Sequence, residues 1–133
     1  MIDVSVLICT RDRGASLSRT LDSVTRAVGV AGDVAVEMVV VDNGSSDDTA
    51  AHLAAWQAEQ AFPVMVLAEP RAGLARARNL GLAHVRGRIV AMTDDDCVLK
   101  PDYLLALVRR FAGSRRRRSS AGGSCRAMPQ TCR

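Results

Sequence analysis

Four short runs of apolar residues divide the chain, and we expect each of them to be a β-strand. They cover residues 4–9, 36–41, 64–67 and 88–93. The runs are rich in β-branched residues and are bounded by polar turns, as strands are. Because they are nearly continuous rather than alternating with polar residues, they are typical of strands buried on both faces of a parallel sheet.

Between and after these runs, apolar residues recur at the spacing of an amphipathic α-helix. The helical segments cover residues 15–28, 45–60, 73–85 and 101–111. Gly29 is expected to end the first helix, and Ser45 or Ser46 to cap the second. Strands that alternate with helices predict an α/β fold, namely a three-layer, mostly parallel sheet with helices on both faces.

Polar clusters follow three of the predicted strands. They read Thr10-Arg11-Asp12-Arg13, Asp42-Asn43-Gly44 and Asp94-Asp95-Asp96. In parallel α/β sheets, ligands bind beyond the carboxyl ends of the strands, which is where these clusters fall. Three adjacent carboxylates repel one another and are costly to bury without partners. A solvated turn or a bound divalent cation would each explain the three aspartates.

The sequence lacks the two common glycine-rich phosphate-binding motifs. The turn after the first strand reads T-R-D-R-G, which does not match G-x-G-x-x-G, and the only lysine is Lys100, which does not belong to a P-loop. A metal ion held by carboxylates is the remaining way to bind a pyrophosphate, and Mg²⁺ and Mn²⁺ are typically held so. In an Asp-x-Asp at a strand end, the outer carboxylates face the same way and the middle one points elsewhere.

The 133 residues suit one domain, and the basic charge of the chain belongs to its C-terminal end. Residues 114–133 carry six arginines and no acid, so the net charge of +4 becomes −2 for residues 1–113. We expect residues 1–113 to form the folded domain and residues 114–133 to be a disordered basic tail. Aromatic residues make up 3% of the chain, which leaves few platforms for base stacking, and no nucleic-acid partner is expected.

Several features of the sequence bear on where the protein is located in the cell. No apolar run approaches the roughly 20 residues of a membrane span, and the start Met1-Ile2-Asp3 does not resemble a signal peptide. These features favour a cytoplasmic location, with peripheral attachment to the cytoplasmic membrane face left open. The four cysteines form no C-x-x-C pair, so we expect free thiols and no zinc site.

Four stretches together resemble the N-terminal, nucleotide-sugar-binding half of family 2 glycosyltransferases with the GT-A fold. They read VSVLICTRDR, MVVVDNGSSDDTAAHL, EPRAGLARARNLGLAHVRGRIVAMTDDD and CVLKPDYLLALVRRF. The resemblance implies transfer of a sugar from a UDP- or GDP-sugar to an acceptor that the sequence does not identify. It also implies a divalent cofactor, Mn²⁺ or Mg²⁺, that neutralises the departing diphosphate.

The resemblance also implies roles for individual residues. Asp94 and Asp96 are expected to hold the metal. The residues expected to bind the nucleotide are Thr10 and Asp42 at the base, Asp95 at the ribose, and Arg13, Arg78 and Asn79 beside them. The general base of the family lies in its second half, so the catalytic residue is unknown here and we expect negligible transferase activity from this chain. Missing second-half strands would leave an exposed sheet edge, and with it self-association.

Two other functions stay open at the level of the sequence. A sugar-phosphate nucleotidyltransferase also uses paired carboxylates and a metal, although T-R-D-R-G is a poor match to its usual glycine-rich turn. A nucleic-acid-binding module would depend on the arginine tail. A third hypothesis concerns that tail itself. One choice of synonymous codons for residues 122–133 encodes R-V-L-P-G-D in another reading frame. This segment resembles the continuation of the family after the last predicted helix. The resemblance suggests a truncation or frameshift after about residue 113.

Overall fold

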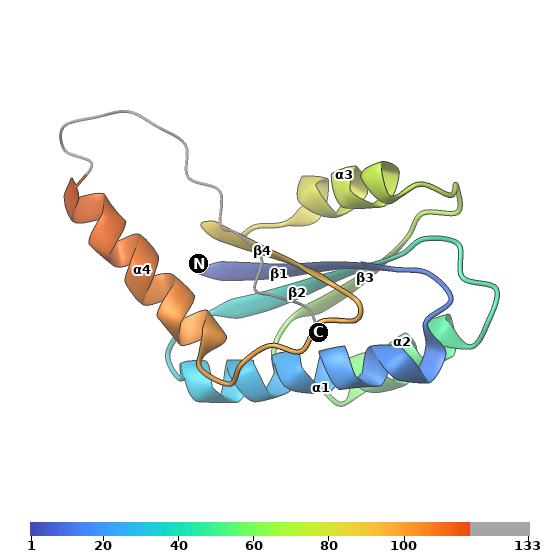
Figure 1. Ribbon diagram of the computed structural model, residues 1–133, viewed down its shortest axis with the longest axis horizontal. Coiled ribbons are helices and arrows are strands. Elements are labelled where there is room, and N and C mark those ends of the chain that lie inside the picture. Colours follow the sequence, from blue (N-terminus) through green and yellow to red (C-terminus); the bar gives the residue numbers. More distant parts are fainter. Residues whose placement is uncertain (118–133) are drawn as a thin grey trace.

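The computed structural model describes residues 1–117 and places four strands and four helices in them (Figure 1). The strands are β1 (Val4–Thr10), β2 (Val36–Asp42), β3 (Val64–Ala68) and β4 (Ile89–Asp94). The helices are α1 (Gly14–Ala31), α2 (Thr49–Ala58), α3 (Leu74–His84) and α4 (Tyr103–Arg117). Strands and helices alternate along the chain, as the apolar pattern predicts.

All four strands are parallel, and their order in the sheet is β3-β2-β1-β4. The predicted α/β fold with a mostly parallel sheet is therefore confirmed. β2 and β3 are added in sequence on one side of β1, and β4 then pairs with the other side of β1. The reversal makes the carboxyl ends of β1 and β4 a topological switch point, where ligands of open α/β sheets bind.

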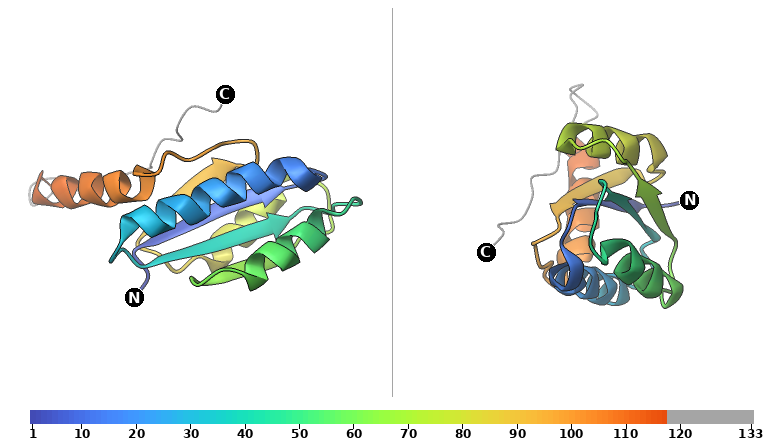
Figure 2. Two further views of the ribbon diagram at one scale, coloured as in Figure 1. Left: turned by 90° about the horizontal axis from the view of Figure 1, so that it is seen from below. Right: turned by 90° about the vertical axis from the view of Figure 1, so that its right-hand side faces the viewer.

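The two faces of the sheet are covered by different helices, which gives three layers (Figures 1 and 2). On one face, α1, α2 and α4 pack over a core that includes Leu17, Leu21 and Leu104. On the other face, α3 is the one helix within residues 1–117 that packs over a smaller cluster around Leu7 and its neighbours in β2. Gly81 allows this close approach of α3, because a Cβ at this position would collide with the Leu7 side chain.

The first helix differs from its prediction at its C-terminus. α1 continues past Gly29 to Ala31, and Gly32, whose φ is +62°, follows it. A Cβ at Gly29 would meet nothing within 4 Å, so nothing in its surroundings requires glycine there. The positive φ belongs to Gly32 instead, and glycine adopts this conformation without steric cost.

The last helix also runs further than predicted. α4 does not end near Phe111 but continues through Gly113 to Arg117. Arginine is a good helix former, and one glycine inside a helix costs only about 1 kcal/mol relative to alanine. The helix therefore crosses the expected domain boundary at residue 113. Residues 118–133 lie outside the described residues. Most of the predicted disordered tail falls in this range, as do the residues on which the reading-frame hypothesis rests.

At the amino-terminal end of the sheet, a buried carboxylate joins β1, β2 and the start of β4. Glu37 is 3% exposed and accepts hydrogen bonds from Ser5 Oγ at 2.6 Å and from the Arg86 backbone N–H at 2.6 Å, while the Arg86 guanidinium pairs with it at 2.7 Å. Ser5 Oγ also accepts a hydrogen bond from the Gly87 N–H at 2.8 Å. This network fixes where β4 enters the sheet. No helix among the described residues is long and apolar enough to cross a membrane.

Candidate functional site

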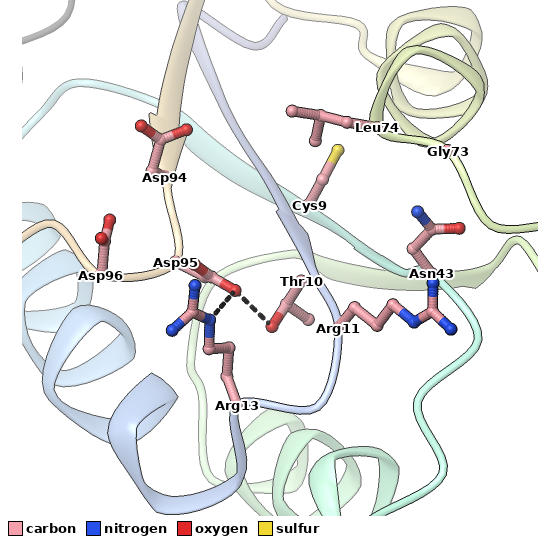
Figure 3. A pocket seen from close by; sticks show the side chains of 10 residues that line it. All are labelled: Cys9, Thr10, Arg11, Arg13, Asn43, Gly73, Leu74, Asp94, Asp95 and Asp96. Atoms are coloured by element: carbon pink, nitrogen blue, oxygen red, sulfur yellow. Dashed lines mark hydrogen bonds and ion pairs between the residues drawn. The ribbon is translucent and has the colours of Figure 1, made fainter.

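A cleft of about 420 Å³ opens at the carboxyl-terminal edge of the sheet, over β1 and β4 (Figure 3). Its volume falls in the range of small-molecule sites, roughly 300–1,000 Å³. The residues that line it are Cys9, Thr10, Arg11, Arg13, Asn43, Gly73, Leu74, Asp94, Asp95 and Asp96. The cleft therefore lies at the topological switch point and is walled by both acidic and basic side chains.

Asp95 is tied to the end of β1 and to the loop that follows it. Its carboxylate accepts a hydrogen bond from Thr10 Oγ1 at 3.0 Å and pairs with Arg13 Nε at 3.3 Å (Figure 3). Thr10 is buried, the Asp95 side chain is 13% exposed, and the Arg13 side chain is 52% exposed. The middle aspartate thus has two partners, which orient it and offset part of its charge.

Asp94 and Asp96, on either side of it, present their carboxylates close together. Their oxygens and the sulfur of Cys97 all lie within 4.8 Å of one another. Cys97 is disulfide-bonded, so its sulfur is not a thiolate ligand, and the expectation of free thiols is wrong for this cysteine. Asp94 is 3.7 Å from Arg78 Nη2. Among the described residues Asp96 makes no ion pair, which leaves its exposed carboxylate open to a cation.

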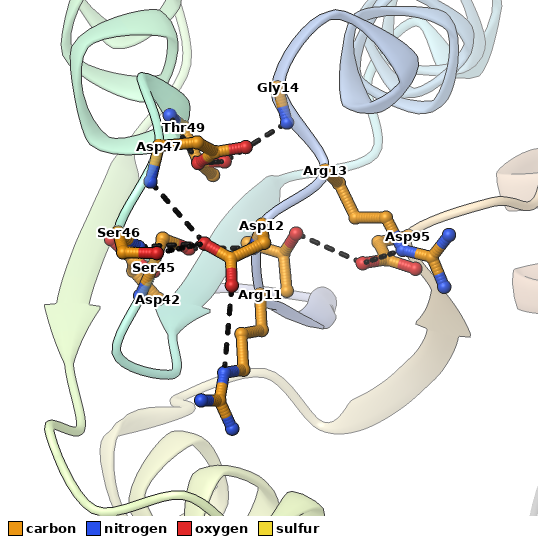
Figure 4. A network of polar contacts seen from close by, with 11 residues as sticks. Arg11, Asp12, Arg13, Gly14, Asp42, Ser45, Ser46, Asp47, Thr49 and Asp95 are labelled. Atoms are coloured by element: carbon orange, nitrogen blue, oxygen red, sulfur yellow. Dashed lines mark hydrogen bonds and ion pairs between the residues drawn. The ribbon is translucent and has the colours of Figure 1, made fainter.

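The loop after β1 is fastened to the turn after β2 by Asp12 (Figure 4). Asp12 Oδ1 accepts hydrogen bonds from the Ser46 N–H at 2.7 Å and the Asp47 N–H at 3.3 Å, and Ser45 Oγ accepts one from the Asp12 N–H at 3.0 Å. These hydrogen bonds, that of the Ser46 N–H first, lower the pKa of Asp12 below its usual value. The φ of Asp12 is +50°, an uncommon conformation that the side-chain contacts hold in place.

The same contacts explain why the second helix starts later than predicted. Ser45 and Ser46 do not cap α2, because they bind Asp12 across the two loops. The helix begins at Thr49, and no side-chain hydrogen bond caps its start at Asp48. Thr49 faces back toward the first loop, where its Oγ1 accepts a hydrogen bond from the Gly14 N–H at 3.0 Å.

The residues expected to bind the nucleotide do not all meet at the cleft. Thr10, Arg13 and the three aspartates of residues 94–96 line it. Arg78 reaches it only through its contact with Asp94. Asn79 is exposed on α3 and does not line it, and the Asp42 carboxylate accepts a hydrogen bond from the Ser45 N–H at 3.1 Å, which holds the turn.

Asn43 is a cleft residue that the sequence interpretation did not single out. It is 6% exposed, and its Oδ1 is buried without a hydrogen-bond partner among the described residues. A buried acceptor without a donor is costly, and a ligand N–H would satisfy it. Its signal in the sequence is its place beside Asp42 in the D-N-G turn, where turn formation alone accounts for asparagine.

Cys9 is the cleft residue with the most perturbed ionisation. Burial raises the pKa of its thiol to about 11, and the neighbouring carboxylates of Asp94 and Asp95 add to the rise, while Arg78 opposes it. A thiol with this pKa stays protonated at neutral pH, so it is a poor nucleophile. Cys9 therefore contributes an apolar wall to the cleft and not a reactive group.

The family assignment follows from comparison with known sequences. The family model of glycosyl transferase family 2 matches residues 5–117, which covers both loops and the three aspartates of the cleft. The chain belongs to this family. The succinoglycan biosynthesis protein ExoO of Rhizobium meliloti is 31% identical over 108 residues, which cover 81% of this chain and 29% of that protein. An uncharacterised protein of Mycobacterium tuberculosis is 38% identical over 108 residues, which cover 81% of this chain and 32% of that protein.

Solved structures of glycosyltransferases share the fold. A mannosyltransferase from Pyrobaculum calidifontis, in complex with GDP-Man and Mn²⁺, has a TM-score of 0.67 and 28% identity over 77% of this chain and 30% of its own. S. aureus TarS in complex with UDP has a TM-score of 0.70, with 21% identity over 85% of this chain and 32% of its own. The chain spans about a third of the length of the curated relatives it matches, between 29% and 33% for the first three.

Membership of family 2 separates the three functions that the sequence left open. It favours a glycosyltransferase over a sugar-phosphate nucleotidyltransferase, whose glycine-rich turn is absent from the β1–α1 loop. It also favours a glycosyltransferase over a nucleic-acid-binding module. The family model covers the folded residues that build the cleft, whereas the nucleic-acid hypothesis depends on the basic C-terminal end.

Proposed function

We propose that this chain is the nucleotide-sugar-binding part of a metal-dependent glycosyltransferase. In this proposal Asp94 and Asp96 hold Mn²⁺ or Mg²⁺, and the cleft binds the diphosphate and nucleoside of a UDP- or GDP-sugar. The observation that carries it is the pair of carboxylates at the switch point, with the carboxylate between them held aside by Thr10 and Arg13. The solved mannosyltransferase with GDP-Man and Mn²⁺ supports the same combination of ligands.

The residues present fit a divalent ion. Two oxygens bound to one Mg²⁺ at about 2.1 Å lie at most about 4.2 Å apart, and the oxygens of Asp94 and Asp96 lie within 4.8 Å of each other. Both side chains are exposed, so a small rotation closes the difference. Two carboxylates that leave other positions to phosphate oxygens are the usual donor set for this ion. When bound, the metal would stabilise the negative charge of the departing diphosphate.

The nucleoside is proposed to bind between β1 and the turn after β2. Asn43 Oδ1 would accept a hydrogen bond from a base N–H, which gives its unpartnered oxygen a donor. We assign the base to Asn43 and Thr10 rather than to Asp42, whose carboxylate holds the turn through Ser45. Thr10 and Arg13 both bind Asp95 Oδ2, so Asp95 Oδ1 would accept a hydrogen bond from a ribose hydroxyl, and the other guanidinium nitrogens of Arg13 would pair with a phosphate.

Arg78 and Asn79 are proposed to act from α3, at the rim of the cleft. Arg78 lies 3.7 Å from Asp94, so it can move toward a phosphate oxygen without leaving the carboxylate's neighbourhood. We expect the general base and the residues that bind the acceptor to lie in the part of the relatives that this chain does not span. A cytoplasmic location and peripheral membrane attachment stay predictions from the sequence.

Removing one carboxylate tests the metal site. Asp96→Asn keeps the size of the side chain and removes its charge. We expect it to lose most of the Mn²⁺ affinity, and with it the affinity for UDP or GDP in the presence of Mn²⁺. Asp33→Asn is the matched control, because Asp33 is an exposed aspartate between α1 and β2 at the opposite end of the sheet. Equal Mn²⁺ affinity of the two variants would contradict the proposed metal site.

A further inference from the structure

Two hydroxyl side chains lie in the buried stripe of α1, between its apolar residues. Thr20 is 1% exposed and Ser23 is 2% exposed, and both are on the face that packs against the sheet. Polar residues on the buried face of an amphipathic helix are costly unless they are hydrogen-bonded. The hydrogen-bond partners of Thr20 and Ser23 therefore indicate the role of these two hydroxyls.

Both hydroxyls bind the backbone of the segment that carries the three aspartates. Thr20 Oγ1 donates to the Asp95 carbonyl oxygen at 2.8 Å. Ser23 Oγ accepts from the Leu99 N–H at 3.0 Å and donates to the Thr20 carbonyl oxygen at 2.7 Å. Neighbouring positions on one helix thus hold two points of the loop after β4, one at the middle aspartate and one four residues later.

We propose that Thr20 and Ser23 are positioning residues for the metal site, an inference that rests on the proposed function. Asp95 is then held from two sides, by Thr20 at its backbone and by Thr10 and Arg13 at its carboxylate. With Asp95 fixed, the direction of the backbone through Asp94 and Asp96 is fixed too. The two outer carboxylates are exposed, so their spacing depends on this backbone, and α1 keeps them close enough to share one ion.

The other threonine of α1, Thr25, lies on the exposed side of the helix and has different partners. Thr25 Oγ1 lies 3.2 Å from the Leu21 carbonyl oxygen of its own helix and 3.0 Å from Gln60 Oε1, and its single proton can be donated to either. Thr20 differs in being buried and in donating its hydrogen bond to the backbone of the loop that carries the aspartates. The signal is visible in the sequence, since residues 20 and 23 fall on the same helical face as Leu17, Leu21 and Val24.

The experiment compares Thr20→Val and Ser23→Ala with controls from the same chain. Thr25→Val removes a hydroxyl from the same helix. Ser5→Ala removes a serine that is also buried, accepts one backbone N–H and donates one hydrogen bond, but at the opposite end of the sheet. Ser5→Ala should lower the melting temperature at least as much as Ser23→Ala, because the Ser5 hydroxyl donates to the Glu37 carboxylate and hydrogen bonds to charged groups are stronger. Thr20→Ser keeps the hydroxyl and should restore the properties of the wild type.

Mn²⁺ affinity, followed by the electron paramagnetic resonance signal of free Mn²⁺, is the decisive measurement. Thr20→Val and Ser23→Ala should weaken Mn²⁺ binding on the order of tenfold to a hundredfold, as changes to groups behind metal ligands do. Thr25→Val and Ser5→Ala should bind as the wild type does. Equal affinity of Ser23→Ala and Ser5→Ala would overturn the positioning proposal while leaving the proposed function intact.

Hydrogen exchange distinguishes a failure of the positioning proposal from a failure of the proposed function. If the wild type binds no Mn²⁺, the proposed function fails, and the exchange of residues 94–99 then decides the positioning proposal alone. Thr20→Val and Ser23→Ala should speed exchange in that segment more than Ser5→Ala does, without a matching change in β2. Unchanged exchange in residues 94–99 would overturn the proposal.

Discussion

Thr10 donates a hydrogen bond to the carboxylate of Asp95 at 3.0 Å, although the two residues lie 85 positions apart in the sequence. The bond joins the end of β1 to the loop after β4, across the switch point of the sheet. It places the middle aspartate against the buried end of β1 and leaves the outer two at the cleft. The geometry of the candidate metal site thus depends on a contact that only the fold creates.

Removing the Thr10 hydroxyl tests this contact. Thr10→Val keeps the shape of the side chain but leaves the partly buried Asp95 carboxylate without one donor. We expect a loss of about 1–2 kcal/mol in the free energy of unfolding, measured in urea, because an unsatisfied buried acceptor costs this much. Nucleotide affinity should fall as well. Thr25→Val, on the outer side of α1, is the control, and an unfolding free energy for Thr10→Val equal to that of the wild type would contradict the contact.

The Glu37 network predicts a dependence of stability on pH. Burial alone would raise the pKa of Glu37, but hydrogen bonds from Ser5 and Arg86 outweigh it and hold the pKa below its usual value of 4.5. The ionised carboxylate therefore contributes stability that is fully present above pH 4.5 and is lost as the pH falls through the lower folded pKa. Thermal unfolding of the wild type and Glu37→Gln between pH 3 and pH 7 checks this.

Glu37→Gln should be less stable than the wild type at pH 7, and the difference should shrink in acid as Glu37 is protonated in the wild type. A difference that stays constant over the whole range would show that Glu37 acts through its shape alone. Nucleotide binding at pH 7 should change little, because the network lies at the far end of the sheet from the cleft.

Cys9 should resist alkylation. Because burial raises the pKa of its thiol to about 11, little thiolate is present near pH 7. Peptide mapping after treatment with iodoacetamide should find Cys9 largely unmodified at pH 7, with modification increasing as the pH approaches the pKa. Bound nucleotide should slow the reaction further, since Cys9 lines the cleft. Rapid modification at pH 7 would contradict the environment described for this thiol.

The open edge of β4 should cause self-association. Among the described residues β4 is the last strand of the sheet and pairs only with β1. The opposite edge is better protected, because β3 follows Pro63 and its Val64 carbonyl accepts a hydrogen bond from Gln57 Nε2 at 2.9 Å. Unpaired strand edges of this kind favour pairing with another chain, and a lysine on the edge suppresses it.

Analytical ultracentrifugation over a range of protein concentrations measures this association. Thr93→Lys places a charge on β4 at a partly exposed position and should shift the protein toward monomer. Val30→Lys adds the same charge at an exposed position of α1 and should leave the association unchanged. A wild type that stays monomeric at every concentration would rule out association through the β4 edge.

The fold could be predicted from the sequence because its strands are clearly delimited apolar runs. The apolar runs of β1 and β2 have polar residues directly after them, and every predicted strand appears within one residue of its predicted ends. Helix ends were less predictable. Gly29 has the residue type of a helix stop, but the positive φ that requires glycine occurs at Gly32. The start of α2 depends on Asp12, which lies in another loop.

The candidate site was predictable in its acidic residues and less so in its other contacts. Asp94 and Asp96 stand out because an apolar strand directly precedes them. Asn43 does not stand out, because it differs from an ordinary turn asparagine only in its buried Oδ1, which has no hydrogen-bond partner among the described residues, and only the structure shows this. The support of the aspartate loop by Thr20 is likewise a contact between distant segments, 75 positions apart in the sequence.

A calorimetric titration of the wild-type chain with UDP and with GDP, in Mn²⁺ and again after chelation, tests the central claim most directly. The proposal predicts that at least one of the two nucleotides binds in the presence of Mn²⁺ and that chelation abolishes most of this binding. The Asp94 and Asp96 carboxylates would then hold the metal that the diphosphate needs. Equal affinity with and without the metal, or no binding of either nucleotide, would contradict the account.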